Sequence, residues 1–165
     1  MSSIHASAVR FGNTGVLIRG ASGAGKSRLA QTLLLRGHLF GHETRLVADD
    51  RVLIEERDGR LIARAPDAIA GLIEVRGLGV VRFPHLSETS LDLVIDLVPP
   101  AELPRMPDPD DFRAIIGGVT LPRAFASSPE SALEVLLILK GQSGAVPSRD
   151  IALASVRFDG KTERP

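Results

Sequence analysis

The 165-residue sequence predicts a single α/β domain over residues 1–165, with a sheet that mixes parallel and antiparallel strands. Two observations favour this class. Many short apolar runs with hairpin signals follow one another, whereas only two segments show the apolar spacing of helices. The first of these helices directly follows a buried strand and a glycine-rich turn. Because strands and helices do not alternate regularly, an all-parallel sheet is not expected.

The glycine-rich turn at residues 20–27 matches the P-loop pattern of glycine, four free positions, glycine, lysine, and serine or threonine. Glycines let backbone N–H groups approach a phosphate that a Cβ would obstruct. The Lys26 ammonium suits the β- and γ-phosphates, and the Ser27 hydroxyl suits the coordination shell of Mg²⁺. The sequence therefore predicts a nucleoside triphosphate site formed by Gly20, Ala21, Ser22, Gly23, Ala24, Gly25, Lys26 and Ser27.

The residues that flank this turn support the P-loop interpretation over an incidental glycine-rich surface turn. Residues 14–18 read as a buried strand that runs into the turn. From Lys26 to Arg36 the apolar residues recur at helical spacing, and Gly37 stands where a helix C′ glycine is expected. The helix N-terminus would add its N–H groups and dipole to the anion site.

Further along the chain, Asp58-Gly59 predicts a hairpin turn, and five prolines within 99–109 predict a loop. Residues 65–79 are expected to be irregular because they hold three glycines and a proline. Ser128-Pro129-Glu130 predicts the start of a helix that ends at Lys140 before Gly141. Residues 151–158 fit either a strand or a short helix. Strands are expected at 44–47, 51–56, 61–64, 80–83, 91–98, 113–116 and 119–121.

Composition narrows the classes of function. Twenty basic and twenty acidic residues give a formal net charge of zero, which weighs against a dedicated nucleic-acid binder. The absence of cysteine excludes disulfides, thiol catalysis and thiolate metal sites. Since no apolar run approaches the ~18 residues needed to span a bilayer and no signal-peptide pattern opens the chain, a cytoplasmic protein without a membrane partner is expected.

Two pairs of charged residues are candidates for chemistry. Asp49 and Asp50 follow the strand at 44–47, so one carboxylate is expected toward an acceptor and the other toward a metal, with a charged turn as the alternative. Glu74 could ligate Mg²⁺ directly or through another ligand, and Arg76 could neutralise a transferring phosphate. The alternative there is an exposed Glu–Arg pair beside a turn. Taken alone, His5 reads as a surface residue.

Four stretches together resemble the catalytic domain of the bacterial HPr kinase/phosphorylase family. His5 stands fifteen residues before Gly20, and residues 15–27 read GVLIRGASGAGKS. RGH at 36–38 and RLVADDRV at 45–52 are similar to the family's RGH…LVADDxV, with a few extra residues between the halves. EVRGLGVV, which begins at Glu74, is similar to its EIRGLGII signature.

The resemblance implies a fold akin to the P-loop of phosphoenolpyruvate carboxykinases and ATP-dependent phosphorylation of a serine on the phosphocarrier protein HPr. It also implies phosphate-driven removal of that phosphate, regulation of the sugar phosphotransferase system, and a hexamer. Under it, Asp49 is the base toward the serine and the acid in the reverse step. The resemblance also implies that Lys26 grips the β- and γ-phosphates, that Ser27 and Glu74 bind Mg²⁺, and that His5 is an active-site group. Arg76 in catalysis and Asp50 at the metal are expected from the residues themselves.

The sequence departs from the family pattern in two places. Family members usually carry an N-terminal domain, so a short form that holds only the catalytic domain is expected. An arginine of the family lies five residues after a Leu-Pro pair, and here Ser127 stands at that place. Arg123 could substitute for it, or the phosphate-driven reverse reaction could be weakened. A P-loop kinase for a small metabolite and a regulator that only senses nucleotide are the alternative functions.

Overall fold

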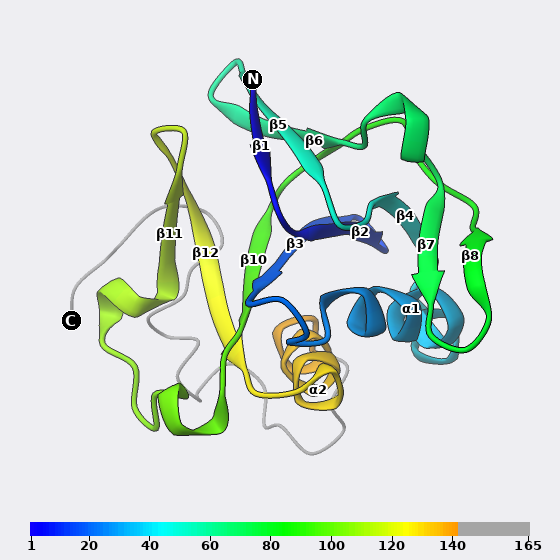
Figure 1. Cartoon of the computed structure of the whole chain (residues 1–165). Helices are drawn as coiled ribbons and strands as arrows, with labels where there is room; N and C mark the ends of the chain where they lie inside the picture. The colour runs from blue at the N-terminus through cyan, green and yellow to red at the C-terminus, as the bar shows by residue number, and fades with distance from the viewer. Residues whose placement is uncertain (142–165) are drawn as a thin grey trace.

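The computed structural model describes residues 1–141, and its largest sheet has six strands (Figure 1). They are β2 (Ser7–Phe11), β3 (Thr14–Gly20), β4 (Thr44–Ala48), β10 (Leu93–Leu97), β11 (Arg113–Ile116) and β12 (Val119–Ala126). Their order is β11-β12-β10-β3-β2-β4. β10 pairs in parallel with β3 and β12, whereas β2 is antiparallel to β3 and β4, and β11 is antiparallel to β12. The predicted mixed sheet is confirmed.

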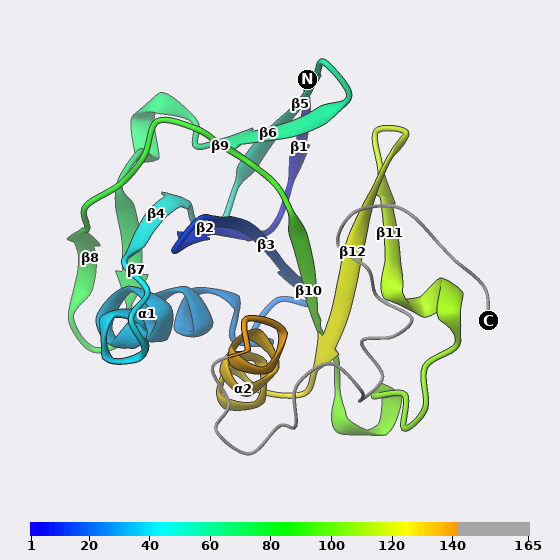
Figure 2. The same ribbon diagram turned by 180° about the vertical axis from the view of Figure 1, so that it is seen from behind.

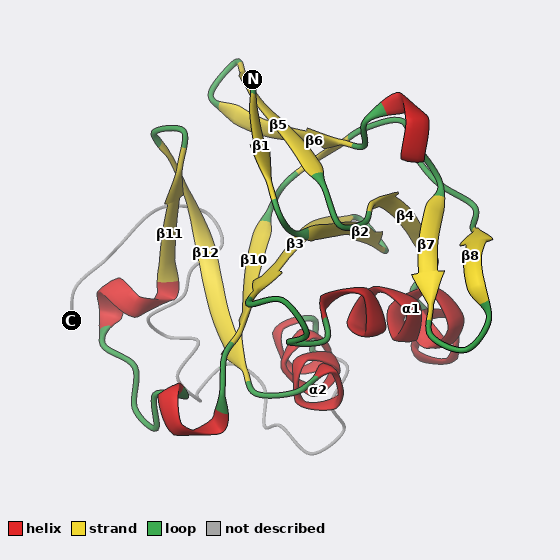
Figure 3. Ribbon diagram, viewed as in Figure 1, coloured by secondary structure: helices red, strands yellow, loops and turns green. Residues whose placement is uncertain are grey.

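Two helices lie together on one side of this sheet, as the opposite views in Figures 1 and 2 both show. They are α1 (Lys26–Arg36) and α2 (Pro129–Leu139). The Ser128 hydroxyl accepts a hydrogen bond from the Ser131 N–H at 3.1 Å, which caps α2 as the sequence predicts. Short 3₁₀ turns lie at Gly37–Phe40, Asp67–Ile69, Pro100–Glu102 and Pro109–Phe112, and Figure 3 draws helical segments in red.

A four-stranded antiparallel sheet covers the other side of the large sheet, and a separate hairpin flanks α1. The smaller sheet has the order β1-β5-β6-β9, and the hairpin joins β7 to β8. In the smaller sheet, the predicted turn at Asp58-Gly59 connects β5 to β6. These elements are β1 (Ser2–Ile4), β5 (Val52–Arg57), β6 (Arg60–Arg64), β7 (Leu72–Val75), β8 (Gly79–Arg82) and β9 (Thr89–Ser90).

The large sheet separates two hydrophobic cores because successive side chains of a strand point to opposite faces. In β3, Val16 and Ile18 face the helices, whereas Leu17 faces the smaller sheet. The same alternation holds in β10, where Ile95 lies on the helix side and Val94 on the other. Each face at the end of β3 can therefore carry a different set of polar groups.

Three sequence-based expectations need correction. Residues 65–79 are not irregular: they contain β7, which ends at the turn before β8. Gly37 is not a left-handed C′ residue, since its φ is −55°; a glycine is needed there because a Cβ would stand 2.3 Å from Thr44 Oγ1. The strand at 119–121 continues to Ala126 through Pro122, which falls where pairing with β11 ends and pairing with β10 begins.

Sequence patterns did not identify β1 and β2, although β2 is an interior strand of the large sheet, between β3 and β4. The candidate strand or helix at 151–158 lies outside the described residues. Within residues 1–141, no helix is both long and apolar enough to cross a membrane.

Candidate active site

The predicted P-loop connects β3 to α1, in the strand–turn–helix order that the motif requires. Gly25, directly before α1, has φ 99°, and a Cβ there would lie 2.7 Å from the Pro129 ring of α2. A side chain at that position would therefore be strained and would collide with α2. The loop leads into a helix N-terminus, whose free backbone N–H groups suit a phosphate.

Lys26 lies within this loop, with its side chain folded back onto it. The residue is only 6% exposed, and its ammonium donates to the carbonyl oxygens of Gly20 and Ala21 at 3.0 Å each. Buried charges are stable only when they are paired or hydrogen-bonded, and these two carbonyls meet that need. The single basic side chain of the motif is thus held at the place where a nucleotide's phosphates would lie.

Asp49 lies immediately after β4 and is 5% exposed. The Ser7 hydroxyl donates to its Oδ1 at 2.6 Å. Burial raises the pKa of the Asp49 carboxyl, while hydrogen bonding from Ser7, Ser27 and the backbone of Asp50 opposes that rise. A raised pKa makes this carboxylate a better proton acceptor than an exposed aspartate, and its contact with Ser27 places it beside the P-loop.

Asp50 turns away from Asp49. It has a left-handed φ of 64°, and the Arg51 N–H donates to the Asp49 carbonyl at 2.7 Å, which closes a three-residue turn. The Asp50 carboxylate therefore faces the surface, where Oδ1 lies 3.3 Å from Nε2 of His5. The structure brings His5 together with Asp50 in one shallow depression, and Asp49 together with Ser27.

Glu74 and Arg76 lie at the end of β7 and in the turn after it, both exposed. The Gln31 side-chain amide donates to the Glu74 carbonyl oxygen at 2.8 Å. Since Gln31 lies one helical turn after Ser27 on the same face of α1, Glu74 borders the helix face that carries Ser27. Among the described residues, Arg76 forms no ion pair and no side-chain hydrogen bond.

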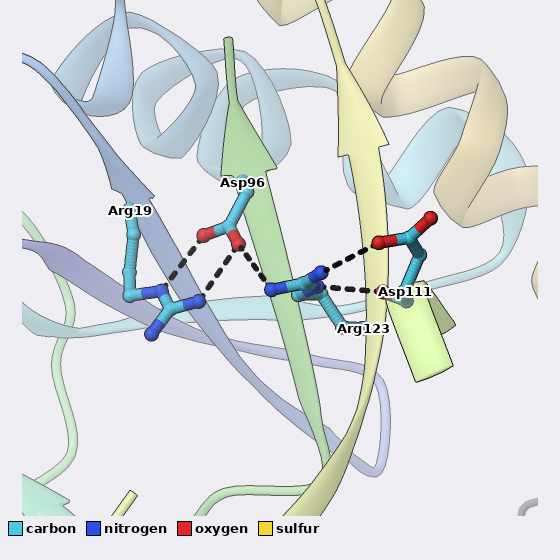
Figure 4. Close-up of polar contacts among 4 residues, drawn as sticks. All are labelled: Arg19, Asp96, Asp111 and Arg123. Carbon is cyan, nitrogen blue, oxygen red and sulfur yellow. Dashed lines mark hydrogen bonds and ion pairs between the residues drawn. The ribbon is translucent and has the colours of Figure 1, made fainter. Parts of the chain in front are cut away.

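Four charged side chains beside the P-loop form a chain of contacts on the face of the large sheet that lies opposite the helices (Figure 4). Asp96 accepts two hydrogen bonds of 2.7 Å from Arg19, the residue before Gly20, and its Oδ2 lies 3.8 Å from Nη1 of Arg123. Arg123 also donates to the Asp111 carbonyl oxygen at 2.6 Å and stacks on Phe125. Sequence reasoning missed this chain because its members are far apart in the sequence.

The chain of ion pairs bears on the predicted substitution of Arg123 for the missing family arginine. Arg123 is already engaged by Asp96, Asp111 and Phe125. Ser127 follows β12 directly, and its backbone N–H donates to the Ser131 hydroxyl at 3.2 Å. A phosphate ligand would therefore have to draw Arg123 out of existing contacts, whereas Ser127 itself carries no charge.

The oxygen donors near the loop suit Mg²⁺, a hard cation that keeps several waters and needs only one or two carboxylates. Ser27 supplies a hydroxyl at the start of α1, and Asp49 lies in contact with it. Within residues 1–141, no three His, Cys, Asp or Glu side chains form a metal-binding cluster. A metal here would thus depend on phosphate oxygens for part of its coordination.

Comparisons with known proteins all point to HPr kinases. The family model for the HPr Serine kinase C-terminal domain matches residues 1–114. An HPr kinase/phosphorylase from Lactobacillus acidophilus is 36% identical over 149 residues, which cover 81% of this chain and 44% of the relative. One from Clostridium tetani is 44% identical over 94 residues, which cover 57% of this chain and 28% of the relative. The chain thus spans less than half the length of these relatives.

A solved structure agrees with the fold. The Hpr(Ser) kinase/phosphatase from Coxiella burnetii superposes with a TM-score of 0.73 at 27% identity, covering 86% of this chain and 95% of that chain. The match confirms the resemblance that the P-loop and the 45–52 and 74–81 motifs indicate.

Proposed function

The chain belongs to the HPr Serine kinase C-terminal domain family, and from this membership and the geometry of the site we propose that it is an ATP-dependent protein-serine kinase whose substrate is HPr. The observation that carries the proposal is the buried carboxylate of Asp49, held beside Ser27 at the P-loop. A protein that only senses nucleotide needs no base at that point.

In the forward reaction, the P-loop N–H groups and Lys26 would hold the β- and γ-phosphates of ATP. Asp49 would accept the hydroxyl proton of the acceptor serine while the serine oxygen bonds to the γ-phosphorus and ADP leaves. In the phosphate-driven reverse step, inorganic phosphate would attack the phosphorus of phosphoserine to form pyrophosphate, and the same carboxyl would return the proton to the departing serine oxygen. Arg76 would neutralise charge on the transferring group, and His5 would act at the edge of the site through its contact with Asp50.

Mg²⁺ would neutralise charge on the β- and γ-phosphates when bound. Ser27 and Glu74 are the ligands that we propose for it. Asp50, also proposed from the sequence, would have to leave its contact with His5 to reach a metal held by Ser27. We also propose a cytoplasmic location and a role in regulating the phosphotransferase system. We propose a hexamer as well, and light scattering of the purified protein would test this oligomeric state.

The test is transfer of labelled γ-phosphate from ATP to purified HPr, with a panel of small metabolites as competing acceptors. Lys26→Ala should abolish transfer while the melting temperature changes little, because the lysine stabilises charge on the transferring group. Lys140→Ala is the matched control, since Lys140 lies at the end of α2 near Thr14, at the opposite end of β3 from the P-loop. Full transfer by a folded Lys26→Ala variant would refute the proposal, and label on a metabolite alone would replace HPr as the substrate.

A further inference from the structure

We infer that Ser7 is a positioning residue that aims the Asp49 carboxylate at the phosphoryl acceptor; the inference rests on the proposed kinase function. The contact joins two strands that are 42 residues apart in sequence. Ser7 is fully buried in β2, where a hydroxyl is unfavourable unless it forms a hydrogen bond. Its bond to Asp49 Oδ1 is short, at 2.6 Å.

An irregularity in β4 explains how Asp49 comes to face Ser7. Ala8 pairs with Ala48 but Val9 pairs with Leu46, so Val47 is an extra residue in β4. Such bulges re-aim the side chains that follow them. Leu46 faces the helices, and both Val47 and Ala48 face the smaller sheet, so that the next side chain returns to the helix side.

Without the extra residue, simple alternation would send the Asp49 carboxylate to the face away from α1. In β2, Val9 and Phe11 face the helices, and Ser7 shares their parity. The bulge therefore brings Asp49 to the side that carries Ser7 and the first turn of α1. The hydroxyl of Ser7 then fixes which way the carboxylate is turned.

The bond from Ser7 holds one oxygen of the Asp49 carboxylate. Oδ1 accepts the Ser7 hydroxyl, and this bond restrains rotation of the carboxylate about its last bond. Restrained rotation matters because a general base must lie within hydrogen-bond reach of the proton that it removes. Loss of the bond should lower the rate of transfer without weakening the binding of either substrate, since Ser7 would touch neither.

The test compares variants of Ser7 in steady-state phosphorylation of HPr. Ser7→Ala should lower kcat by roughly 10-fold, with KM for ATP and for HPr within about twofold of wild type, in line with the rate cost of misplacing a catalytic group. Ser7→Thr keeps the donor but adds a methyl to a packed core, so it should melt at a lower temperature and retain most of kcat. Thr89→Val is the matched control: it removes another buried hydroxyl and should leave kcat unchanged.

A double variant decides whether Ser7 acts through Asp49. In an Asp49→Asn background, adding Ser7→Ala should leave the residual rate within about twofold, because the base is already lost. A further 10-fold fall, a Ser7→Ala variant with normal kcat, or a Ser7→Thr variant as slow as Ser7→Ala would overturn the positioning role alone. A wild-type chain that transfers nothing to HPr would overturn the proposed function and this role with it.

Discussion

Asp96 joins two arginines beside the P-loop, and its conversion to asparagine should destabilise the fold. The carboxylate accepts two 2.7 Å hydrogen bonds from Arg19 and lies near Arg123, and its side chain is only 14% exposed. Asparagine keeps the shape but turns an NH₂ toward one guanidinium. Hydrogen bonds to charged groups contribute about 1.5–3 kcal/mol each, so the variant should lose about 2–3 kcal/mol of stability.

In a chain of this length, 1 kcal/mol corresponds to roughly 2–4 °C in melting temperature, so Asp96→Asn should melt roughly 5–10 °C below wild type. Differential scanning calorimetry is the assay. The control is Glu88→Gln, which breaks the 2.9 Å pair with Arg57, where both side chains are more than 40% exposed. Exposed pairs contribute under about 1 kcal/mol, so this control should shift the melting temperature by no more than a few degrees.

Two results would refute this reasoning: Asp96→Asn melting within about 1–2 °C of wild type, or Glu88→Gln having an equal effect. Either result would mean that the extent of burial does not set the strength of these ion pairs. Since Arg19 directly precedes Gly20, nucleotide titration gives a second readout. Asp96→Asn should also bind ATP several-fold more weakly, because the end of β3 is less firmly held.

Three further predictions concern the site itself. Asp49→Asn should lose phosphorylation and dephosphorylation of HPr together and yet melt above wild type at neutral pH. Burial raises the pKa of the wild-type Asp49 carboxyl, so the folded state binds more protons than the unfolded state. The stability of the wild type therefore falls as pH rises from the unfolded pKa through the folded pKa. Equal melting curves of variant and wild type at pH 7 would contradict this. Glu74→Gln should raise the Mg²⁺ concentration needed for half-maximal transfer much more than it changes metal-free nucleotide affinity, and an unchanged Mg²⁺ titration would remove Glu74 from the site. Wild-type phosphorolysis should be weak relative to kinase activity, and Ser127→Arg should strengthen it, because two anions meet in that step; robust wild-type phosphorolysis that survives Arg123→Ala would show that neither position matters.

Local sequence was sufficient for the P-loop and for the helices because each carries its own signals. The glycines and Lys26 of the loop, and Ser128 before α2, act on residues within a few positions of themselves. The mixed sheet followed from the many short strands with hairpin signals and from the presence of only two helical segments. β2 escaped notice because Ser7, Ala8 and Val9 are all buried, which hides the alternation that identifies a strand with one face in water.

The site was harder to predict because its contacts join distant strands. A motif resemblance singled out Asp49, but nothing near residue 49 points to Ser7, since the pair depends on the register of β2 against β4 and on one extra residue in β4. The same limit applies to Arg19 and Asp96, which are 77 residues apart. Local patterns identify reactive residues; the sheet register determines their partners.

The two faces of the large sheet carry aspartates with different surroundings near the end of β3. On the helix side, Asp49 is buried with the hydroxyls of Ser7 and Ser27 and the backbone of Asp50 as partners, and burial raises its pKa. On the other side, Asp96 is paired with the guanidinium groups of Arg19 and Arg123. Two aspartates at the same edge of the sheet thus differ in chemistry because of their neighbours: Asp49 faces hydroxyl groups that leave it free to accept a proton, whereas Asp96 holds two arginines in place.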